Sequence, residues 1–441
     1  MGEHGIDSPT FSASILMRCR DLVANHKEHY YHLHVEQEPA IWKLHRQALG
    51  LFAIHLHLLD NMAGQDLPQT MKAYVLEQFK TPYAFRDVPV PAIEDPRDIL
   101  IRVDASSYCH TDAVLASGDM RPPPLPLIGG HEFAGTIVAL PPGENSLSRG
   151  GLKVGDRVAV PGRGHHVCGK CLECQHPSGS DPDEPGYSVY CPYALGGLGI
   201  GKDGGFREYA LVDSKQVEVI PEGMTAVEVA PLMCAGLTIY SALKKCDLKP
   251  GQRVGIMGCG GGLGHLGLQF ATKMGLKTTG VDVAPRALEL ARSLGTGADI
   301  VDASALSAET VRQKMGKEDA DEGREHYSEM GLDAVLILPE SQKSFDYGVD
   351  LVRNGGLVVV VSFPAQGFQV SAADLVFRRI RVEGSLIGSN RAMRDMFAFC
   401  VEHGVRAKVK TYPFEKLNEL VEDYHSGSVA GKLVLDLGMK S

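Results

Sequence analysis

The chain has 441 residues, which is long for one hydrophobic core and suits two domains, and 44% of its residues are hydrophobic. Its formal net charge of -10 does not favour binding to nucleic acid or to an anionic membrane. The first residues lack the apolar core of a signal peptide, and no apolar stretch near the N-terminus is long enough to span a bilayer. We therefore expect a cytoplasmic protein with small-molecule partners and with no nucleic-acid or membrane partner.

Residues 1–70 differ from the rest of the chain, and we expect an N-terminal extension whose order the sequence leaves open. They are rich in histidine and contain Trp42, the one tryptophan. Apolar residues recur at helical spacing over Ala40–Leu59, which is compatible with an amphipathic helix. The histidines could bind a metal ion, but no i, i+4 pair lies beside other ligands.

Between Met71 and Leu232 the pattern is of short strands interrupted by glycine and proline, which predicts a mostly β domain. The predicted strands include Ile99–Val103, Phe133–Ala139 and Arg157–Val160.

Beyond Gly251, apolar strands alternate with helices, and this alternation predicts a doubly wound parallel sheet. The predicted elements, in order, are strand Arg253–Met257, a helix from Gly262, strand Lys277–Val283, a helix from Pro285, and strands Ile300–Asp302, Leu332–Leu338 and Leu357–Ser362. We interpret the acidic run Lys317–Glu329 as a solvated surface loop. The chain ends in a strand, Lys432–Leu437, which we expect to complete the first domain.

A glycine-rich run follows the predicted strand Arg253–Met257 and opens into a helix. Glycines lack a Cβ, so the backbone can turn tightly and a pyrophosphate can approach the N–H groups at the helix start. Such a run alone also fits a plain strand-to-helix turn, but here an aspartate closes the next strand. We predict a dinucleotide site made of Gly258, Gly261, Gly262, Leu263, Gly264 and Asp282.

Asp282 favours NAD(H) over NADP(H). Its carboxylate can accept hydrogen bonds from the adenosine ribose hydroxyls and would repel a 2'-phosphate. Arg286 lies close by in the sequence and weakens this inference, because an arginine would suit that phosphate. NAD(H) is the predicted cofactor.

Three separate pieces of the chain carry side chains that suit a zinc ion, namely Cys109, His131 and Cys234. Taken singly, each is more simply a buried cysteine or a hydrogen-bonded histidine. Together they supply two thiolates and an imidazole, which leaves the fourth position of a tetrahedral zinc open. Asp112 is placed to orient the histidine from behind.

From Met71 to the C-terminus, the chain resembles the medium-chain dehydrogenase/reductase family, specifically its zinc-containing alcohol dehydrogenases. The resemblance rests on Cys-His-Thr-Asp from Cys109, Gly-His-Glu from Gly130, Val-Gly-Asp-Arg-Val from Val154, Cys-Ala-Gly-Leu-Thr from Cys234, and the glycine loop with Asp282. It implies an α/β fold with a GroES-like, mostly β catalytic domain (residues 71–233 and 382–441) and a Rossmann cofactor domain (residues 234–381). The short stretch between Cys191 and Cys234 is similar to that of tetrameric microbial members. The resemblance thus implies a homo-tetramer, with a dimer as the second choice.

The resemblance also implies roles for individual residues. Cys109, His131 and Cys234 would ligate the catalytic zinc, and Glu132 would approach it when water or substrate leaves. Thr111 would pass on the alcohol proton, and His110 would lie near the cofactor pyrophosphate. The implied reaction is hydride transfer between a primary or secondary alcohol and NAD, or the reverse reduction of an aldehyde or ketone.

A second cysteine cluster matches the family's structural zinc lobe. Four thiolates form a closed tetrahedral site that stabilises a loop too small to have its own core. The loop Gln175–Tyr190 is longer than in the family pattern, but closing it costs only roughly 0.7 kcal/mol more. Its proline, glycine and aspartate content predicts an exposed bulge. The expected ligands of this second zinc are Cys168, Cys171, Cys174 and Cys191.

Two departures from the family pattern bear on activity. Val114 stands where many members have the histidine that ends the proton relay, so Thr111 would pass its proton to the cofactor ribose and on to water. No tryptophan follows Trp42, and Met120 and Arg163 stand where ethanol-selective relatives narrow their pocket. We therefore expect a wider pocket, with Met120 as an adaptable wall and Arg163 either meeting a polar or anionic substrate or lying solvated on the surface.

Two other functions remain open. One is a zinc-free quinone or enoyl reductase of the same superfamily, although such an enzyme would have no need of all three catalytic ligands. The other is a non-catalytic NAD-sensing protein that uses the cysteine lobe as a binding module, which the acidic composition and the intact Cys-His-Thr-Asp element disfavour.

Overall fold

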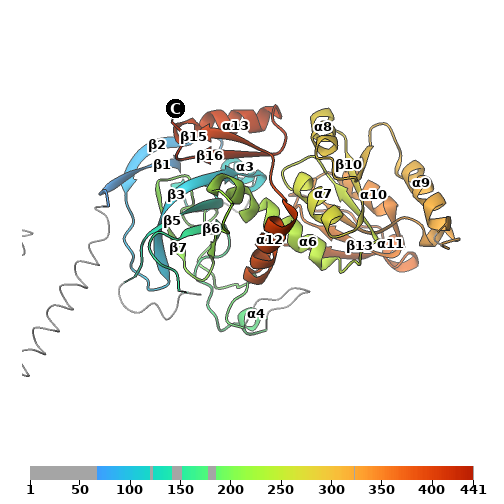
Figure 1. Cartoon of the computed structure of the whole chain (residues 1–441), viewed down its shortest axis with the longest axis horizontal. Coiled ribbons are helices and arrows are strands. Elements are labelled where there is room, and N and C mark those ends of the chain that lie inside the picture. The colour runs from blue at the N-terminus through green and yellow to red at the C-terminus, as the bar shows by residue number, and fades with distance from the viewer. Residues whose placement is uncertain (1–66, 120–122, 142–150, 177–184, 322, 441) are drawn as a thin grey trace, which may run out of the picture. The chain divides into compact units, whose positions relative to one another are not determined.

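The structure is a computed structural model that describes residues 67–119, 123–141, 151–176, 185–321 and 323–440 (Figure 1). The segment Ala40–Leu59 and the expected pocket residue Met120 lie outside these ranges. The described residues form an α/β fold, as the sequence predicts, with a six-stranded parallel sheet, a seven-stranded, mainly antiparallel sheet and a small three-stranded antiparallel sheet.

The half that we expect to be catalytic, residues 71–233 and 382–441, here called the catalytic half, has a larger sheet of seven strands, in the order β15-β16-β3-β5-β6-β8, with β7 pairing β3. The last strand of the chain pairs antiparallel with β3 from Leu433 to Asp436, so the C-terminal segment returns to this sheet. A three-stranded sheet, β2-β1-β4, accompanies it. The strands of the two sheets are β1 (Thr70–Leu76), β2 (Ala84–Pro89), β3 (Asp98–Tyr108), β4 (Leu127–Ile128), β5 (Glu132–Ala139), β6 (Arg157–Pro161), β7 (Tyr209–Asp213), β8 (Glu218–Val219), β15 (Val409–Pro413) and β16 (Lys432–Asp436).

The half that we expect to bind the cofactor, here called the cofactor half, contains a six-stranded sheet in the order β11-β10-β9-β12-β13-β14, and all its pairings are parallel. The order reverses between β9 and β12, and ligands bind at such switch points in doubly wound sheets. Along β12 every residue is buried, because helices cover both faces. The strands are β9 (Arg253–Met257), β10 (Lys277–Asp282), β11 (Asp299–Asp302), β12 (Leu332–Ile337), β13 (Val352–Val360) and β14 (Arg381–Gly384).

Helices α6, α7 and α12 share a core with one face of the parallel sheet, whereas α9 and α10 pack on the other. Figure 1 shows α12 and α6 between the two sheets. The helices are α3 (His110–Ser117), α4 (Leu172–Gln175), α5 (Ala226–Val229), η2 (Ala230–Met233), α6 (Ala235–Lys245), α7 (Gly264–Lys273), α8 (Pro285–Ser293), α9 (Ala308–Asp321), η3 (Tyr327–Glu329), α10 (Gln342–Leu351), α11 (Ala372–Phe377), α12 (Asn390–His403), η4 (Phe414–Lys416) and α13 (Leu417–Ser426).

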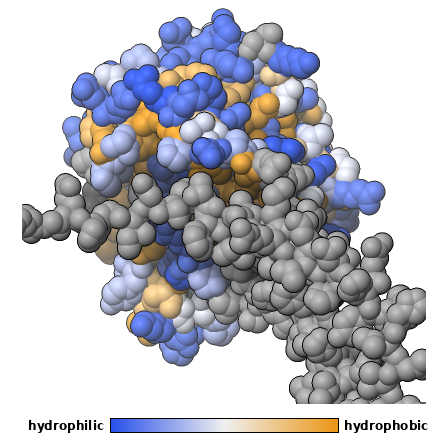
Figure 2. All heavy atoms as spheres, turned by 90° about the vertical axis from the view of Figure 1, so that its left-hand side faces the viewer, coloured by the Kyte–Doolittle hydropathy of each residue, from blue (hydrophilic) through white to orange (hydrophobic). Residues whose placement is uncertain are grey.

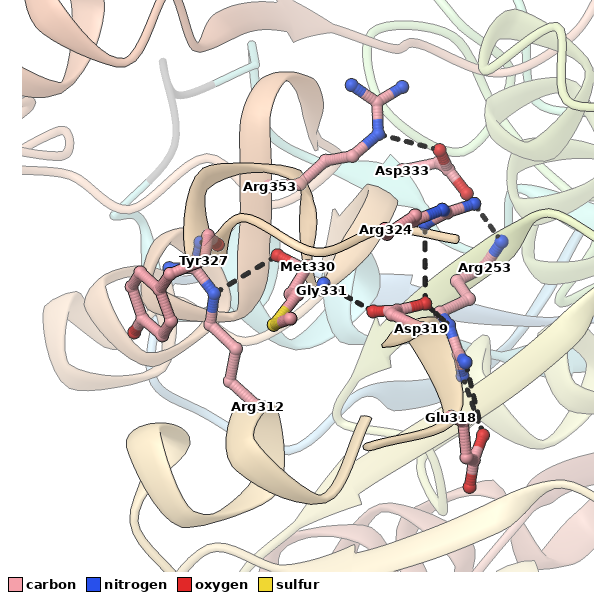
Figure 3. Close-up of polar contacts among 10 residues, drawn as sticks. All are labelled: Arg253, Arg312, Glu318, Asp319, Arg324, Tyr327, Met330, Gly331, Asp333 and Arg353. Carbon is pink, nitrogen blue, oxygen red and sulfur yellow. Dashed lines mark hydrogen bonds and ion pairs between the residues drawn. The ribbon is translucent and has the colours of Figure 1, made fainter. Parts of the chain in front are cut away.

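The acidic run is solvated over most of its described residues, as the sequence indicates, but it is not a loop throughout. Its first residues end helix α9, and Asp319 is fully buried. The Asp319 carboxylate lies 3.1 Å from Arg253 Nε and 3.4 Å from Arg324 Nη1, and it accepts the N–H of Gly331 at 3.0 Å (Figure 3). Composition alone did not reveal this, because the buried cation that pairs with Asp319 comes from β9, far away in the sequence.

Exposed hydrophobic residues are scattered over the face seen in Figure 2, where hydrophilic side chains lie between them. Within the described ranges, no single helix is long and apolar enough to cross a membrane, and only the bent pair Ala226–Met233 with Ala235–Lys245 passes such a test of length and composition.

Candidate active site

The turn into helix α3 positions the first cysteine and its supporting carboxylate. Cys109 is the N-cap of α3, and Asp112 Oδ2 accepts its backbone N–H at 2.9 Å. The other oxygen, Asp112 Oδ1, lies 2.8 Å from His131 Nδ1. One buried aspartate therefore caps the helix and orients the imidazole, leaving His131 Nε2 to face the cysteines.

The second cysteine begins helix α6. Cys234 Sγ lies 3.9 Å from Cys109 Sγ, and the ligand atoms of Cys109, His131, Glu132 and Cys234 all lie within 4.8 Å of one another. Glu132 is fully buried and pairs with Lys432 Nζ, which also donates to the carbonyl of Tyr108 at 3.0 Å. Burial raises the pKa of Glu132 to about 7, although the lysine opposes the shift.

These residues fit a zinc ion. His131 Nε2 is buried and has no hydrogen-bond partner among the described residues, which is costly unless a ligand fills the gap. A hydrogen bond from the Cys234 thiol lowers the pKa of Cys109, and the positive charge of Lys432 acts in the same direction. Two sulfurs and one unpaired imidazole nitrogen form the donor set of an open zinc site.

The glycine loop lies at the switch point of the parallel sheet. Gly258 has φ +77°, a conformation that side chains other than glycine rarely adopt, and a Cβ on Gly264 would lie 2.1 Å from the carbonyl oxygen of Gly258. Asp282 Oδ2 accepts the N–H of Gly260 at 3.1 Å, so the carboxylate that ends β10 is held against this loop. These glycines let the loop turn tightly and line the cavity at the start of α7, where backbone N–H groups can bind a pyrophosphate.

A cavity of about 610 Å³ joins the two constellations. It brings together every predicted catalytic and cofactor residue except Asp112 and Glu132, which lie behind the zinc ligands. The apolar part of its lining, which the sequence did not single out, includes Ile200, Leu338, Val361, Phe363, Leu386 and Ile387.

Two contacts cross the cofactor cleft, and neither was predicted. His110 Nε2 lies 3.2 Å from Glu340 Oε1, just beyond the end of β12, and Arg286 donates to the carbonyl of Ser428. Within its own half, His110 also has Nδ1 at 3.0 Å from the hydroxyl of Tyr424. Glu340 could have been predicted from the sequence, because it is a carboxylate shortly after a strand of the parallel sheet, and ligands bind at the carboxyl ends of such strands.

The second cysteine cluster forms a compact lobe. Its four sulfurs lie within 4.8 Å of one another, and backbone N–H groups point at two of them: Cys168 N lies 3.3 Å from Cys191 Sγ, and Cys171 N lies 3.3 Å from Cys168 Sγ. The N–H groups of Lys170 and Cys171 lower the pKa of Cys168 to about 6. Such donors favour thiolates, so this lobe also fits zinc.

Arg163 neither lines the cavity, where it could meet a substrate, nor lies solvated on the surface, so both expectations for it were wrong. The expectation of an exposed bulge in the cysteine lobe also needs correction. Arg163 is only 2% exposed and is not among the described residues that line the cavity; its neighbour Gly162 lines it instead. The end of the loop Gln175–Tyr190 is not an exposed bulge throughout, because Tyr187 and Ser188 are buried. Residues 177–184 of that loop lie outside the described ranges.

Two family models match the chain: the alcohol dehydrogenase GroES-like domain over residues 95–222 and the zinc-binding dehydrogenase domain over residues 262–402. An alcohol dehydrogenase of Geobacillus stearothermophilus is 34% identical over 83% of this chain and 99% of its own length, and one of Moraxella is 32% identical over 84% and 100%.

Solved structures agree with these matches. The acetophenone reductase of Geotrichum candidum in complex with NAD is 27% identical, with a TM-score of 0.68 over 84% of this chain and 98% of that one. The alcohol dehydrogenase of Aeropyrum pernix is 28% identical, with a TM-score of 0.68 over 83% and 99%. With this geometry and these relatives, the chain belongs to the zinc-type medium-chain dehydrogenase/reductase family.

Proposed function

We propose that this chain is a zinc-dependent alcohol dehydrogenase that transfers hydride between an alcohol and NAD, with Cys109, His131 and Cys234 as ligands of the catalytic zinc. The observation that carries the proposal is the buried, unpaired His131 Nε2 that faces two cysteines in the same cavity as the glycine loop. A zinc-free quinone or enoyl reductase would not need two cysteines and a histidine that face one another. A non-catalytic NAD sensor would not explain why these side chains share one cavity with the glycine loop.

Within this scheme, the chain's own residues bind, orient and move a proton. When bound, zinc lowers the pKa of a ligated hydroxyl, and NAD accepts the hydride. Asp112 fixes the tautomer and direction of His131 through Nδ1. Thr111 lines the cavity beside Cys109, where its hydroxyl can accept the alcohol proton and pass it to the cofactor ribose and water. Lys432 holds the Glu132 carboxylate behind the site.

The contacts of Asp282 and Arg286 support NAD rather than NADP. Asp282 lines the cavity at the end of β10, where its charge would meet a 2'-phosphate. Arg286, the residue that could have compensated, donates instead to the carbonyl of Ser428. His110 lines the same cavity and is placed to meet the pyrophosphate.

The cavity supports a substrate larger than ethanol. At Gly162 the wall is backbone, and a Cβ there would lie 2.3 Å from the carbonyl oxygen of His131. Leu386 and Phe363 are about half exposed, so apolar side chains extend the lining toward solvent. We propose longer or aromatic alcohols and aldehydes as the substrate class.

We further propose a second, structural zinc at Cys168, Cys171, Cys174 and Cys191, a cytoplasmic location, and a homo-oligomer, tetrameric or else dimeric. Strand β14 is an edge of the parallel sheet, and in the nearby helix α11 Val376 is 67% and Phe377 81% exposed. An open edge with apolar neighbours is suited to a second copy of the chain.

The test is NADH oxidation by the purified protein with aldehydes from acetaldehyde to bulky aromatic ones, with and without a zinc chelator. We expect chelator-sensitive turnover whose kcat/KM rises with aldehyde size. Turnover that survives complete zinc removal would refute the zinc proposal, and equal efficiency across the series would refute the wide pocket.

A further inference from the structure

Arg163 directly follows a residue that lines the cavity, but its own side chain contacts a different part of the chain. Its Nη1 donates to the carbonyl of Gly388 at 2.9 Å, and its Nη2 donates to Asn390 Oδ1 at 2.6 Å and to the carbonyl of Gln216 at 3.1 Å. The guanidinium is thus buried among backbone and amide oxygens.

Gly388 belongs to the crossover segment, residues 385–389, which joins β14 to α12. Leu386 and Ile387 of this segment line the cavity. On its other side the segment packs closely on α6, since a Cβ on Gly388 would lie 2.0 Å from Ser241 Oγ. The cavity wall is therefore fixed between helix α6 and the Arg163 guanidinium.

The cysteine lobe reaches the same guanidinium. Arg163 Cζ lies 5.5 Å from the centre of the Tyr187 ring, which is 5% exposed. Tyr187 packs in one cluster with Cys174 and Cys191 and comes from the long loop of the lobe. A continuous set of contacts thus runs from this lobe, through Arg163, to the apolar wall of the cavity.

We propose that Arg163 is a positioning residue that sets the substrate-size preference by holding the crossover segment. Tyr187 contacts the Arg163 guanidinium and so links the cysteine lobe, with its long loop, to this preference. The inference rests on the proposed function. The Arg163 guanidinium holds Gly388 in the segment and Asn390 at the start of α12 at once, which neither a lysine nor an apolar residue can do. Displacement of a cavity wall by about 1 Å can change the efficiency of a poorly fitting substrate by a large factor.

The experiment compares Arg163→Met and Tyr187→Leu with the wild type, using acetaldehyde and benzaldehyde as substrates. Arg207→Met is the matched control, because Arg207 is another buried arginine of the catalytic half, bonded to the carbonyl of Asp203 rather than to the crossover segment. The readouts are kcat and KM for each aldehyde, the Kd of NADH from its fluorescence, and zinc content.

For Arg163→Met we expect KM for benzaldehyde to rise on the order of tenfold, while kcat/KM for acetaldehyde stays within about twofold and the Kd of NADH and the zinc content do not change. Tyr187→Leu should raise KM for benzaldehyde relative to acetaldehyde in the same direction but less strongly. Because Tyr187→Leu retains every Arg163 hydrogen bond, it also tests the inference if Arg163→Met fails to fold. In the control Arg207→Met, any loss of kcat/KM should be equal for the two aldehydes. The same equal loss in Arg163→Met, or an unchanged KM for benzaldehyde in Tyr187→Leu, would overturn the inference. Failure of the wild type to reduce any aldehyde would instead refute the proposed function.

Discussion

The imidazole of His265 accepts the backbone N–H of Lys408 at Nε2, at 3.0 Å, and so joins the cofactor half to the chain that leads into β15. Its Nδ1 lies 2.9 Å from the carbonyl of Gly261 in the glycine loop, where it must be the donor. Both ring nitrogens are thereby used by a neutral imidazole, which is fully buried. Burial lowers the pKa of His265 to about 4.

This contact makes folding stability depend on pH. Because the pKa of His265 is lowered relative to the unfolded chain, its contribution is present above the ordinary value of about 6.5 and is lost as pH falls toward 4. The full loss is on the order of 3 kcal/mol. Urea unfolding of the wild type and His265→Gln at pH 7.5 and pH 5 should show a stability gap that narrows at the lower pH. A gap of equal size at both pH values would contradict the assignment.

Asp319 offers a test of the ion-pair network away from the cofactor (Figure 3). Asp319→Asn keeps the shape but leaves Arg253 and Arg324 without their buried negative partner, and we expect a loss of about 3 kcal/mol in unfolding free energy. Asp321→Asn, in an exposed position of the same helix, is the control. The Kd of NADH should not change in either variant; a large change in Asp319→Asn would mean that the network supports the cofactor site.

The strands of the parallel sheet could be predicted closely, and the failures have physical causes. Apolar runs identify β9 and β12, because strands that are covered on both faces read as continuous apolar runs and not as an alternation of apolar and polar residues. Strand β13 begins at Val352, earlier than the predicted Leu357, because Val352 pairs with Leu332 ahead of an irregularity, and Arg353 and Asn354, which follow Val352, break the apolar pattern.

The residues of the site could be predicted where they belong to short sequence motifs, but not where they depend on contacts between residues that are distant in the sequence. Cys109 and Asp112 are close in sequence, so their joint role follows from local spacing. Lys432 meets Glu132 only because β16 pairs with β3. The direction of Arg163 depends likewise on the crossover segment, which no local pattern places.

The Lys432–Glu132 pair should behave as a unit. Lys432→Met leaves the Glu132 carboxylate buried without its cation, and we expect a loss of about 3–5 kcal/mol in unfolding free energy. Adding Glu132→Gln to Lys432→Met should restore part of that loss, because the uncompensated charge is gone. A double-mutant cycle by urea unfolding of the zinc-loaded protein measures the coupling, and additive losses would show that the two side chains act independently.

Cofactor choice should depend on the charge of Asp282. Its Oδ1 accepts the N–H of Val283 at 2.8 Å, and the amide oxygen of Asp282→Asn can still accept that N–H. The substitution removes the charge and also the hydrogen bond from Gly260 to Oδ2. We expect the ratio of kcat/KM for NADH over NADPH to fall roughly tenfold, which corresponds to about 1.4 kcal/mol. Asp302→Asn, at the end of the next strand β11, is the control and should leave the ratio unchanged. If Asp282→Asn also leaves it unchanged, the discrimination against a 2'-phosphate comes from the shape of the cleft and not from this carboxylate.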